Sequence, residues 1–442
     1  MGKGRVGAGA LPRDPDPYVP GHGDPRYHVG HYDLALDYRL ATNALRAVAT
    51  LTVVGIEPTD TLALDLHALT VRKVRVDGAV VRHRHTGSRL VVALPAPLPA
   101  GGQVTVRISY AGRPGCVDGP HGPAGWEELD DGVLVASQPD GSPSWFPCND
   151  RVSDKSTYRL QVATESDYTV VATGTPAKPR REAGTRRWTF DQRRPTSAYL
   201  MALHIGRYTG TTIPGPVPIR VHHPAGQAPR VRRAFAGLPA MLETFAERFG
   251  PYPFDRYDVV VTAEPLEIPL EAQGMATFGR NFLEPGWEQE RLVAHELAHQ
   301  WFGNAVTARA WRDIWLHEGF ACYAEWLWAQ ACGRERTAVL AGQHWARLQR
   351  LPQDLVLADP GPALMFDDRV YKRGALAVHA LRLRLGDRAF FRMLRDWVGR
   401  HRYASVTTDD FVAHVDGYAA EPTGPLLHAW LVSRPLPPLS PG

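Results

Sequence analysis

The chain has 442 residues, of which 44% are hydrophobic and 22% charged, and this length is enough for the cores of two or three domains. The formal net charge of +4 is small for a chain of this size, which argues against a nucleic-acid partner. The four cysteines are scattered and show no C-x-x-C spacing, which argues against a disulfide framework and against a cysteine-ligated metal.

The two ends of the chain differ in composition from the rest. Residues 1–23 are rich in Gly, Pro and Asp and contain no apolar core of the kind found in secretory signals. We expect residues 1–23 to be flexible and the tail, residues 435–442, to be disordered. No apolar run approaches the length of a membrane span, so we expect a cytoplasmic protein without a membrane partner.

Short apolar runs separated by turn residues dominate residues 24–208. Their alternation and β-branched content predict strands, and Asp77-Gly78 and Asp131-Gly132 predict hairpin turns. The predicted strands are 32–38, 47–54, 61–66, 71–76, 90–94, 104–110 and 158–163. We therefore expect residues 24–208 to form an antiparallel β-domain, either a sandwich or a saddle.

The spacing of apolar residues becomes helical in the second part of the chain. The predicted helices are 230–249, 287–302, 314–330, 371–385 and 389–398. Few strand-like runs remain, of which 257–262 is an example. We expect residues 209–434 to form a mainly helical domain with a small sheet, beginning near the Gly and Pro residues of segment 206–216.

The segment ERLVAHELAHQWFG, residues 290–303, contains a metal-binding pattern. In a helix, residues four apart share a face, so His295 and His299 can each present a ring nitrogen to one metal ion. Glu296 follows the first histidine, where its carboxylate can reach a water beside the ion without being a ligand. A catalytic zinc needs a third protein ligand, and Glu318 in WLHEGFA, 18 residues beyond His299, is the candidate.

The alternative interpretation is a surface helix with two solvated histidines. The neighbours of the histidines argue against it, because they are apolar and indicate a buried helix: Leu292, Val293, Leu297 and Trp301. Buried imidazole and carboxylate groups need partners, and a metal ion satisfies both kinds at once. The predicted cofactor is therefore one Zn²⁺ per chain.

HELAHQWFGN, followed by WLHEGFA, resembles the zinc signature of the aminopeptidases that include aminopeptidase N and leukotriene A hydrolase. The family commonly has Asn before the ligand glutamate, where this chain has His317. The resemblance extends in family order from His28 to Leu385 and lacks the family's large C-terminal helical domain. It implies a short form, with an N-terminal β-domain followed by a thermolysin-like, gluzincin catalytic domain.

Two further segments resemble the part of this family that holds the substrate's amino group. PLEAQGMATFG resembles the G-x-M-E-N strand and puts Glu271 at the glutamate that binds the free amine, although Leu270 stands for Met and Ala272 for Asn. QPDGSPSWFPCND resembles the segment ending in F-P-C-x-D and puts Gln138 where many members have a second such glutamate. The resemblance implies substrate binding by Glu271 and Gln138, with Asp150 as a structural residue of the same loop.

VYKRGA resembles the family's Y-x-K-G-type helix start, which implies that Tyr371 stabilises the transition state; Arg373 stands where Lys is usual. The resemblance therefore implies a zinc-dependent aminopeptidase that hydrolyses the N-terminal peptide bond of peptides with a free N-terminus. In this mechanism Glu296 is the general base that acts on a zinc-activated water. The oligomeric state stays open.

Several other interpretations are left. A thermolysin-like zinc endopeptidase would share the zinc ligands, but Glu271 favours an aminopeptidase because an endopeptidase has no ammonium group to bind. Only Gln138 suggests an epoxide hydrolase, and the intact Glu296 argues against a scaffold that has lost catalysis. Glu325, seven residues after Glu318, could orient a ligand histidine or be a solvated helix residue.

Overall fold

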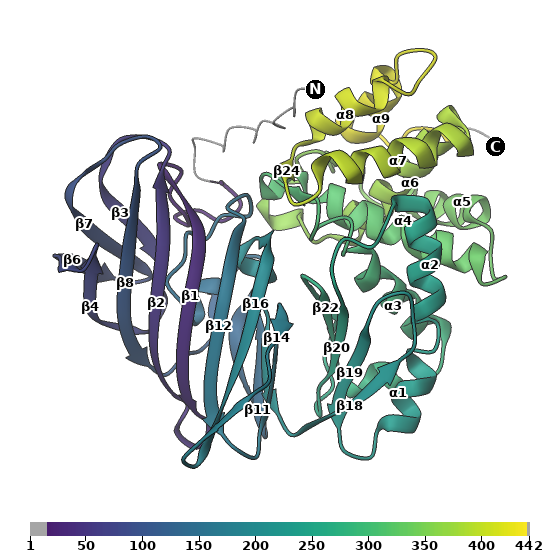
Figure 1. Cartoon of the computed structure of the whole chain (residues 1–442). Helices are drawn as coiled ribbons and strands as arrows, with labels where there is room; N and C mark the ends of the chain where they lie inside the picture. Colours follow the sequence, from purple (N-terminus) through teal and green to yellow (C-terminus); the bar gives the residue numbers. More distant parts are fainter. Residues whose placement is uncertain (1–15, 440–442) are drawn as a thin grey trace, which may run out of the picture.

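The computed structural model describes residues 16–439, which form a β-rich part and a helix-rich part side by side (Figure 1). Strand pairing changes between the parts at Arg207: β17 (Leu203–Gly206) pairs within the first part and β18 (Tyr208–Ile213) within the second. This position lies within two residues of the boundary expected between residues 208 and 209. The predicted order, a β-domain followed by a mainly helical domain, is confirmed.

A nine-stranded sheet is the largest element of the β-domain. Its strands follow the order β14-β16-β12-β1-β2-β8-β4-β5, with β15 paired to β16. Their bounds are β1 (Tyr27–Arg39), β2 (Ala44–Gly55), β4 (Thr70–Val76), β5 (Ala79–Val80), β8 (Gln103–Gly112), β12 (Ser156–Glu165), β14 (Thr175–Pro176), β15 (Arg180–Glu182) and β16 (Thr185–Thr196). One pairing differs from the antiparallel expectation, because β1 and β12, which are distant in the sequence, run parallel.

Two smaller sheets complete the β-domain, with the orders β13-β17-β11-β10-β9 and β3-β7-β6. Their bounds are β3 (Thr59–Asp65), β6 (His83–Thr86), β7 (Arg89–Leu98), β9 (Val117–Gly119), β10 (Gly122–Leu129), β11 (Gly132–Ala136) and β13 (Thr169–Ala172). The hairpin predicted at Asp77-Gly78 is present, and both residues have the positive φ of a tight turn. The second hairpin turns one residue earlier than predicted, because Gly132 already pairs with Leu129.

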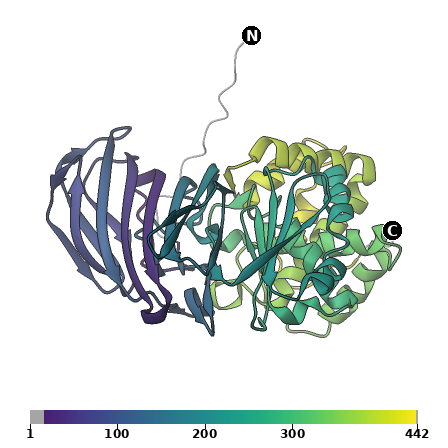
Figure 2. The same cartoon turned by 60° about the horizontal axis from the view of Figure 1, so that its bottom comes forward.

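The helix-rich domain contains a five-stranded sheet, β18-β19-β20-β22-β21, and helices cover one side of it in both views (Figures 1 and 2). The strands are β19 (Ile219–Pro224), β20 (Tyr257–Val261), β21 (Leu270–Ala272) and β22 (Met275–Phe278), with a separate pair, β23 (Thr307–Ala308) and β24 (Ser405–Val406). The helices are α1 (Ala228–Ala234), α2 (Leu238–Phe249), α3 (Trp287–Ala298), α4 (Trp315–Ala331), α5 (Thr337–Leu348), α6 (Asp368–Leu385), α7 (Asp387–His401), α8 (Thr408–Asp416) and α9 (Gly424–Leu431).

The single helix predicted over residues 230–249 is two helices, and this prediction was wrong. The chain breaks after Ala234, and α2 starts afresh behind Gly237 with Pro239 in its first turn, a position that suits the fixed φ of proline. Among residues 16–439, no helix has both the length and the hydrophobicity needed to cross a membrane.

Helices α4 and α6 cross with their backbones in contact. A Cβ atom added to Gly319 of α4 would lie 2.8 Å from the Cα atom of Gly374 on α6, which is closer than side chains approach. The two glycines therefore let the helices meet at this point. The crossing sets the first turn of α6, which carries Tyr371, against the first turn of α4, which carries Glu318.

Residues 16–23 are held by contacts with both domains, so the expectation of flexibility for 1–23 was wrong for this part. Tyr18 is 3% exposed; its hydroxyl donates to Asp359 Oδ1 (2.5 Å) and accepts from the Gly361 amide (2.7 Å). The rest of that segment, residues 1–15, lies outside the described residues. The amino-acid composition of this segment did not indicate that the Tyr18 ring would be buried by contacts with residues distant in the sequence.

The C-terminal tail is also held, as far as residue 439. The Leu436 amide donates to Gln353 Oε1 (2.9 Å), and Trp345 Nε1 donates to the Pro437 carbonyl (2.8 Å). Arg373 donates to the carbonyls of Trp430 (2.9 Å) and Arg434 (2.8 Å), which ties α6 to this end of the chain. The disorder expected for 435–442 is thus wrong for residues 435–439, and residues 440–442 lie outside the description.

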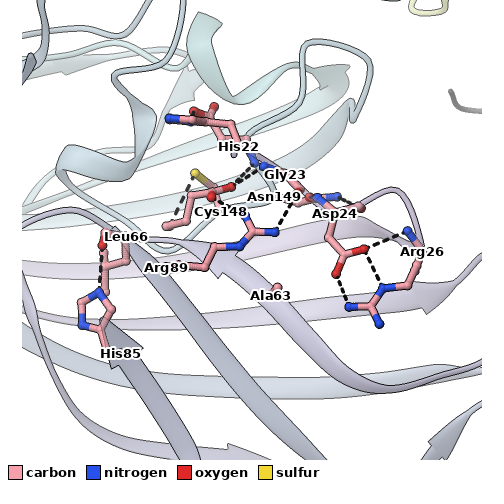
Figure 3. Close-up of polar contacts among 12 residues, drawn as sticks. His22, Gly23, Asp24, Arg26, Ala63, Leu66, His85, Arg89, Cys148 and Asn149 are labelled. Carbon is pink, nitrogen blue, oxygen red and sulfur yellow. Dashed lines mark hydrogen bonds and ion pairs between the residues drawn. The ribbon is translucent and has the colours of Figure 1, made fainter. Parts of the chain in front are cut away.

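A buried polar cluster fixes residues 22–24 to the β-domain (Figure 3). The Gly23 amide donates to Asp65 Oδ2 (2.8 Å), and Arg89 bonds both the Gly23 carbonyl (2.7 Å) and Asp65 Oδ1 (2.5 Å). His22 Nδ1 lies 2.9 Å from Asp150 Oδ2. Through this contact, Asp150 ties the loop that follows Gln138 to the N-terminal segment that contains His22.

Candidate active site

Helix α3 brings His295 and His299 together. Both side chains are buried, and their ring centroids lie 4.8 Å apart, as expected for residues one helical turn apart. Val293 and Leu297 pack into the core and fix the face that the histidines present. The two histidines therefore point at one place in the protein interior.

Glu318, in the first turn of α4, faces the same place. Its Oε2 atom lies 3.3 Å from His295 Nε2 and 3.5 Å from His299 Nε2. The candidate ligand atoms of the three residues all lie within 4.8 Å of one another. The structure thus brings together the three residues that the sequence pattern selected as metal ligands.

The other nitrogen of each ring has its own acceptor. His295 Nδ1 lies 2.7 Å from Glu325 Oε1, and His299 Nδ1 lies 3.1 Å from the Phe302 carbonyl. Such acceptors keep the proton on Nδ1 and leave the Nε2 lone pair free for a metal. The role left open for Glu325 is therefore decided by geometry: it contacts a histidine of the cluster and is 4% exposed.

The charges of this cluster fit a divalent cation. Burial lowers the pKa of His295, but the hydrogen bonds to Glu318 and Glu325 outweigh it and raise the pKa to about 9. Burial raises the pKa of Glu318, but His299 and His295 outweigh it and hold this pKa well below its usual value. The buried carboxylates thus attract positive charge to the Nε2 atoms, and a zinc ion held by two histidines and one carboxylate would supply it.

Glu296 is next to the cluster but does not belong to the ligand set. Its side chain is buried, and Oε2 has no hydrogen-bond partner within residues 16–439. Burial raises the pKa of Glu296 to about 8, with the nearby histidines opposing this shift. The Glu296 side chain lines the cavity, where a carboxylate can act on a water molecule.

Glu271 and Gln138 meet beside Glu296. Gln138, from the β-domain, donates its Nε2 to Glu271 Oε1 at 2.8 Å, and Glu271 lies on β21 of the helical domain. Ligand-type atoms of Glu271, Glu296 and His299 lie within 4.8 Å of one another. The two residues selected by resemblance for amine binding therefore form one polar surface across the domain boundary.

Tyr371 lies in the first turn of α6. Its ring is 6.1 Å from the ring of His295, and it lines the same cavity. Burial, followed by Glu318 and Glu271, raises the pKa of Tyr371 well above its usual value. The hydroxyl group thus remains protonated and can donate a hydrogen bond.

His317, which departs from the resemblance, uses one of its ring nitrogens in a backbone contact. Its Nε2 accepts from the Ala308 amide at 2.7 Å, and burial lowers its pKa to about 3. The neutral ring therefore holds β23 against α4. It leaves the three-residue set intact.

The cavity that contains these groups has a volume of about 540 Å³. It continues past the histidines along α3, α5 and α6, where charged side chains absent from our sequence predictions line it: Glu288, Arg291, Arg347, Asp368 and Lys372. Motif spacing selects residues near the metal, but it gives no signal for these side chains. Glu325 alone carried such a signal, through its seven-residue spacing from Glu318.

Two family models match the chain. One, described as "Peptidase family M1 domain", matches residues 233–430, and the other, "Peptidase M1 N-terminal domain", matches residues 28–200. Among solved structures, a mutant M1 zinc metallopeptidase from Deinococcus radiodurans bound to a Tyr-Ser-Ala substrate is 33% identical, with a TM-score of 0.89. The similarity covers 96% of this chain and 98% of that one.

Curated relatives are longer. Aminopeptidase M1-A from Oryza sativa subsp. japonica is 26% identical over 69% of this chain and 37% of its own length. Human endoplasmic reticulum aminopeptidase 1 is 26% identical over 86% of this chain and 44% of its own length. The chain thus spans less than half the length of these curated relatives.

Proposed function

The chain belongs to peptidase family M1, and on this premise we propose that it is a zinc-dependent aminopeptidase that removes the N-terminal residue of peptides. One observation carries the proposal beyond zinc hydrolysis: the contact of Gln138 Nε2 with Glu271 Oε1 beside Glu296. A polar, negatively charged surface at this point suits a substrate ammonium group. A thermolysin-like endopeptidase would have no use for it.

His295, His299 and Glu318 would hold the zinc ion, which would supply a Lewis acid for the scissile carbonyl and for the attacking water molecule. Glu296 takes the proton of the attacking water on its carboxylate and passes it to the leaving amine. Glu325 holds the His295 ring in place through Nδ1.

The remaining residues position the substrate. Glu271 pairs with the α-ammonium group, with Gln138 as a neutral neighbour, and this pairing puts the first peptide bond over the site. Tyr371 donates its hydroxyl proton in a hydrogen bond to the oxyanion, a contribution of about 3 kcal/mol for one such donor. The four free cysteines fit a reducing compartment, so we further propose that the protein acts in the cytoplasm.

Aminoacyl-anilides and their N-acetylated counterparts, assayed with and without a zinc chelator, test this function. We expect hydrolysis of the free-amine substrates only, and loss of activity with the chelator that zinc restores. Cleavage of blocked substrates at comparable rates would contradict the aminopeptidase and favour the endopeptidase. Activity that survives complete metal removal would contradict the zinc mechanism.

A further inference from the structure

Lys372 is a buried cation on the wall of the cavity. Its side chain lines the cavity and the residue is 8% exposed. Its Nζ atom donates to Cys322 Sγ at 3.2 Å, and across residues 16–439 it forms no salt bridge within 4.0 Å. A thiol is a weak acceptor, and an ammonium has three N–H groups. Within residues 16–439, the buried ammonium thus has no carboxylate in direct contact.

The acids along this wall already have partners. Glu288 Oε2 accepts from Arg291 Nε (2.7 Å), and Asp368 Oδ2 accepts from Arg347 Nη2 (2.6 Å). Glu325 accepts from Arg291 Nη1 (3.2 Å) in addition to its contact with His295. Lys372 is therefore the cation of this wall that lacks a carboxylate in direct contact.

Lys155, another buried lysine, has a fuller set of hydrogen-bond acceptors. Its Nζ atom donates to three oxygen atoms, the carbonyls of Asn304 (2.9 Å) and Ala305 (3.3 Å) and the hydroxyl of Thr307 (2.7 Å). Lys372 has one sulfur acceptor instead. Burial lowers the pKa of Lys372, but Cys322, Glu325 and Asp368 outweigh it and raise the pKa, so the side chain is charged.

Lys372 lies on the side of the metal-ligand cluster away from the amine-binding pair. Glu271 groups with His299 and Glu296. Lys372 instead neighbours Glu325, which contacts the Nδ1 side of His295, the ring edge opposite Glu318. The same cavity is lined by Glu271, the metal-ligand cluster and Lys372, so a peptide whose amino group is held by Glu271 has room to extend toward Lys372 beyond its first bond.

We propose that Lys372 binds a carboxylate group on the leaving part of the substrate, which makes short peptides with a free C-terminus, or peptides with an acidic second residue, the preferred class. This inference rests on the proposed aminopeptidase function. His344 and Trp326, whose stacked rings have centroids 5.1 Å apart, line the same cavity.

Four substrates separate the possibilities: the dipeptide Leu-Gly as free acid, Leu-Gly amide, Leu-Glu amide and Leu-Gln amide. We expect kcat/KM to be about tenfold or more higher for the acid than for Leu-Gly amide, mainly through KM. A comparable advantage of Leu-Glu amide over Leu-Gln amide would identify an acidic side chain as a second source of the carboxylate. Equal kcat/KM across all four substrates would overturn the proposal without any variant.

Lys372→Met should reduce these ratios to about one, whereas Lys372→Arg should keep a preference for the carboxylate. Lys178→Met, at an exposed position of the β-domain, is the matched control and should keep the wild-type ratios. Ratios unchanged in Lys372→Met would overturn the assignment to Lys372.

Calorimetric binding of Leu-Gly acid and Leu-Gly amide to the zinc-loaded Glu296→Gln variant gives a readout independent of turnover. We expect the acid to bind about tenfold tighter, and equal affinities would overturn the proposal. Leucyl-anilide separates the two levels of inference. Failure to cleave it contradicts the aminopeptidase, whereas its cleavage with equal treatment of acid and amide contradicts only the role of Lys372.

Discussion

Gly374 of α6 lies so close to Gly319 of α4 that a Cβ atom added to Gly374 would meet the Gly319 Cα atom at 2.7 Å. Both neighbours are backbone atoms, which cannot move aside as the end of a flexible side chain can. The distance between Glu318 and Tyr371 therefore depends on two residues that have no side chain of their own.

Gly374→Ala should force α4 and α6 apart and destabilise the protein by about 1–3 kcal/mol. Because α6 carries Tyr371, we also expect kcat to fall in the protein that remains folded. Urea unfolding and kinetics of zinc-loaded protein measure the two effects. Gly342→Ala is the matched control, since its added Cβ atom meets nothing within 4 Å and alanine favours a helix. Equal stability of the two variants would contradict the close crossing.

Glu296→Gln should retain zinc and lose turnover by about 10²–10⁴-fold, because the amide cannot accept the proton of the attacking water. Metal content by atomic emission and kcat on a free-amine substrate are the measurements. A variant that loses the metal would show that Glu296 is a ligand and not a base.

Glu325→Gln should weaken zinc binding by about 10–100-fold, because the carboxylate that holds His295 Nδ1 at 2.7 Å is replaced by a neutral amide. Competition with a chromophoric chelator measures the affinity. Glu288→Gln is the control, because Glu288 also contacts Arg291 but is largely exposed and does not touch a histidine of the cluster. Similar affinities in wild type and Glu325→Gln would leave Glu325 with no part in the metal site.

His22 should make the stability depend on pH. Burial lowers its pKa, but Asp150, Asp65 and Asp140 outweigh burial and raise the pKa from 6.5 to about 9. The folded state then holds the proton more tightly than the unfolded state, so the stabilisation is complete below pH 6.5 and is lost as the pH rises through 9. Urea unfolding should show wild type exceeding His22→Gln by about 1–3 kcal/mol more at pH 6 than at pH 9.5. A difference that does not change with pH would contradict a charged His22.

The parts of the fold that the sequence predicted well are those with strong local patterns. Helices α3 and α4 combine regular apolar spacing with the spaced ligand residues, and the structure brings these residues within contact distance. The break at Gly237 was missed because Val231, Phe235 and Leu238 keep a helical spacing through it. Hydrophobic periodicity alone does not show that a new helix begins after Gly237, with Pro239 in its first turn.

The contacts that could not be predicted are those made by residues distant in the sequence. Tyr18 reaches Asp359 and Gly361, and nothing near Tyr18 in the sequence indicates these partners. Lys372 follows Tyr371 in a helix start that the resemblance identified, yet only the packing of α4, α5 and α6 shows that it lines the cavity. Which side chains line a cavity depends on tertiary structure, so no spacing pattern in the sequence identifies them.

The hydrogen bond between Gln138 and Glu271 joins two domains that have separate cores. If these residues hold the amino end of a peptide, the β-domain takes part in choosing the cut although it holds no metal ligand. A chimera with a foreign β-domain would then still hydrolyse peptide bonds but would lose its selectivity for the first bond of the substrate. Contacts at the domain boundary would thus set the position of cleavage, and the residues of α3 and α4 would carry out the hydrolysis.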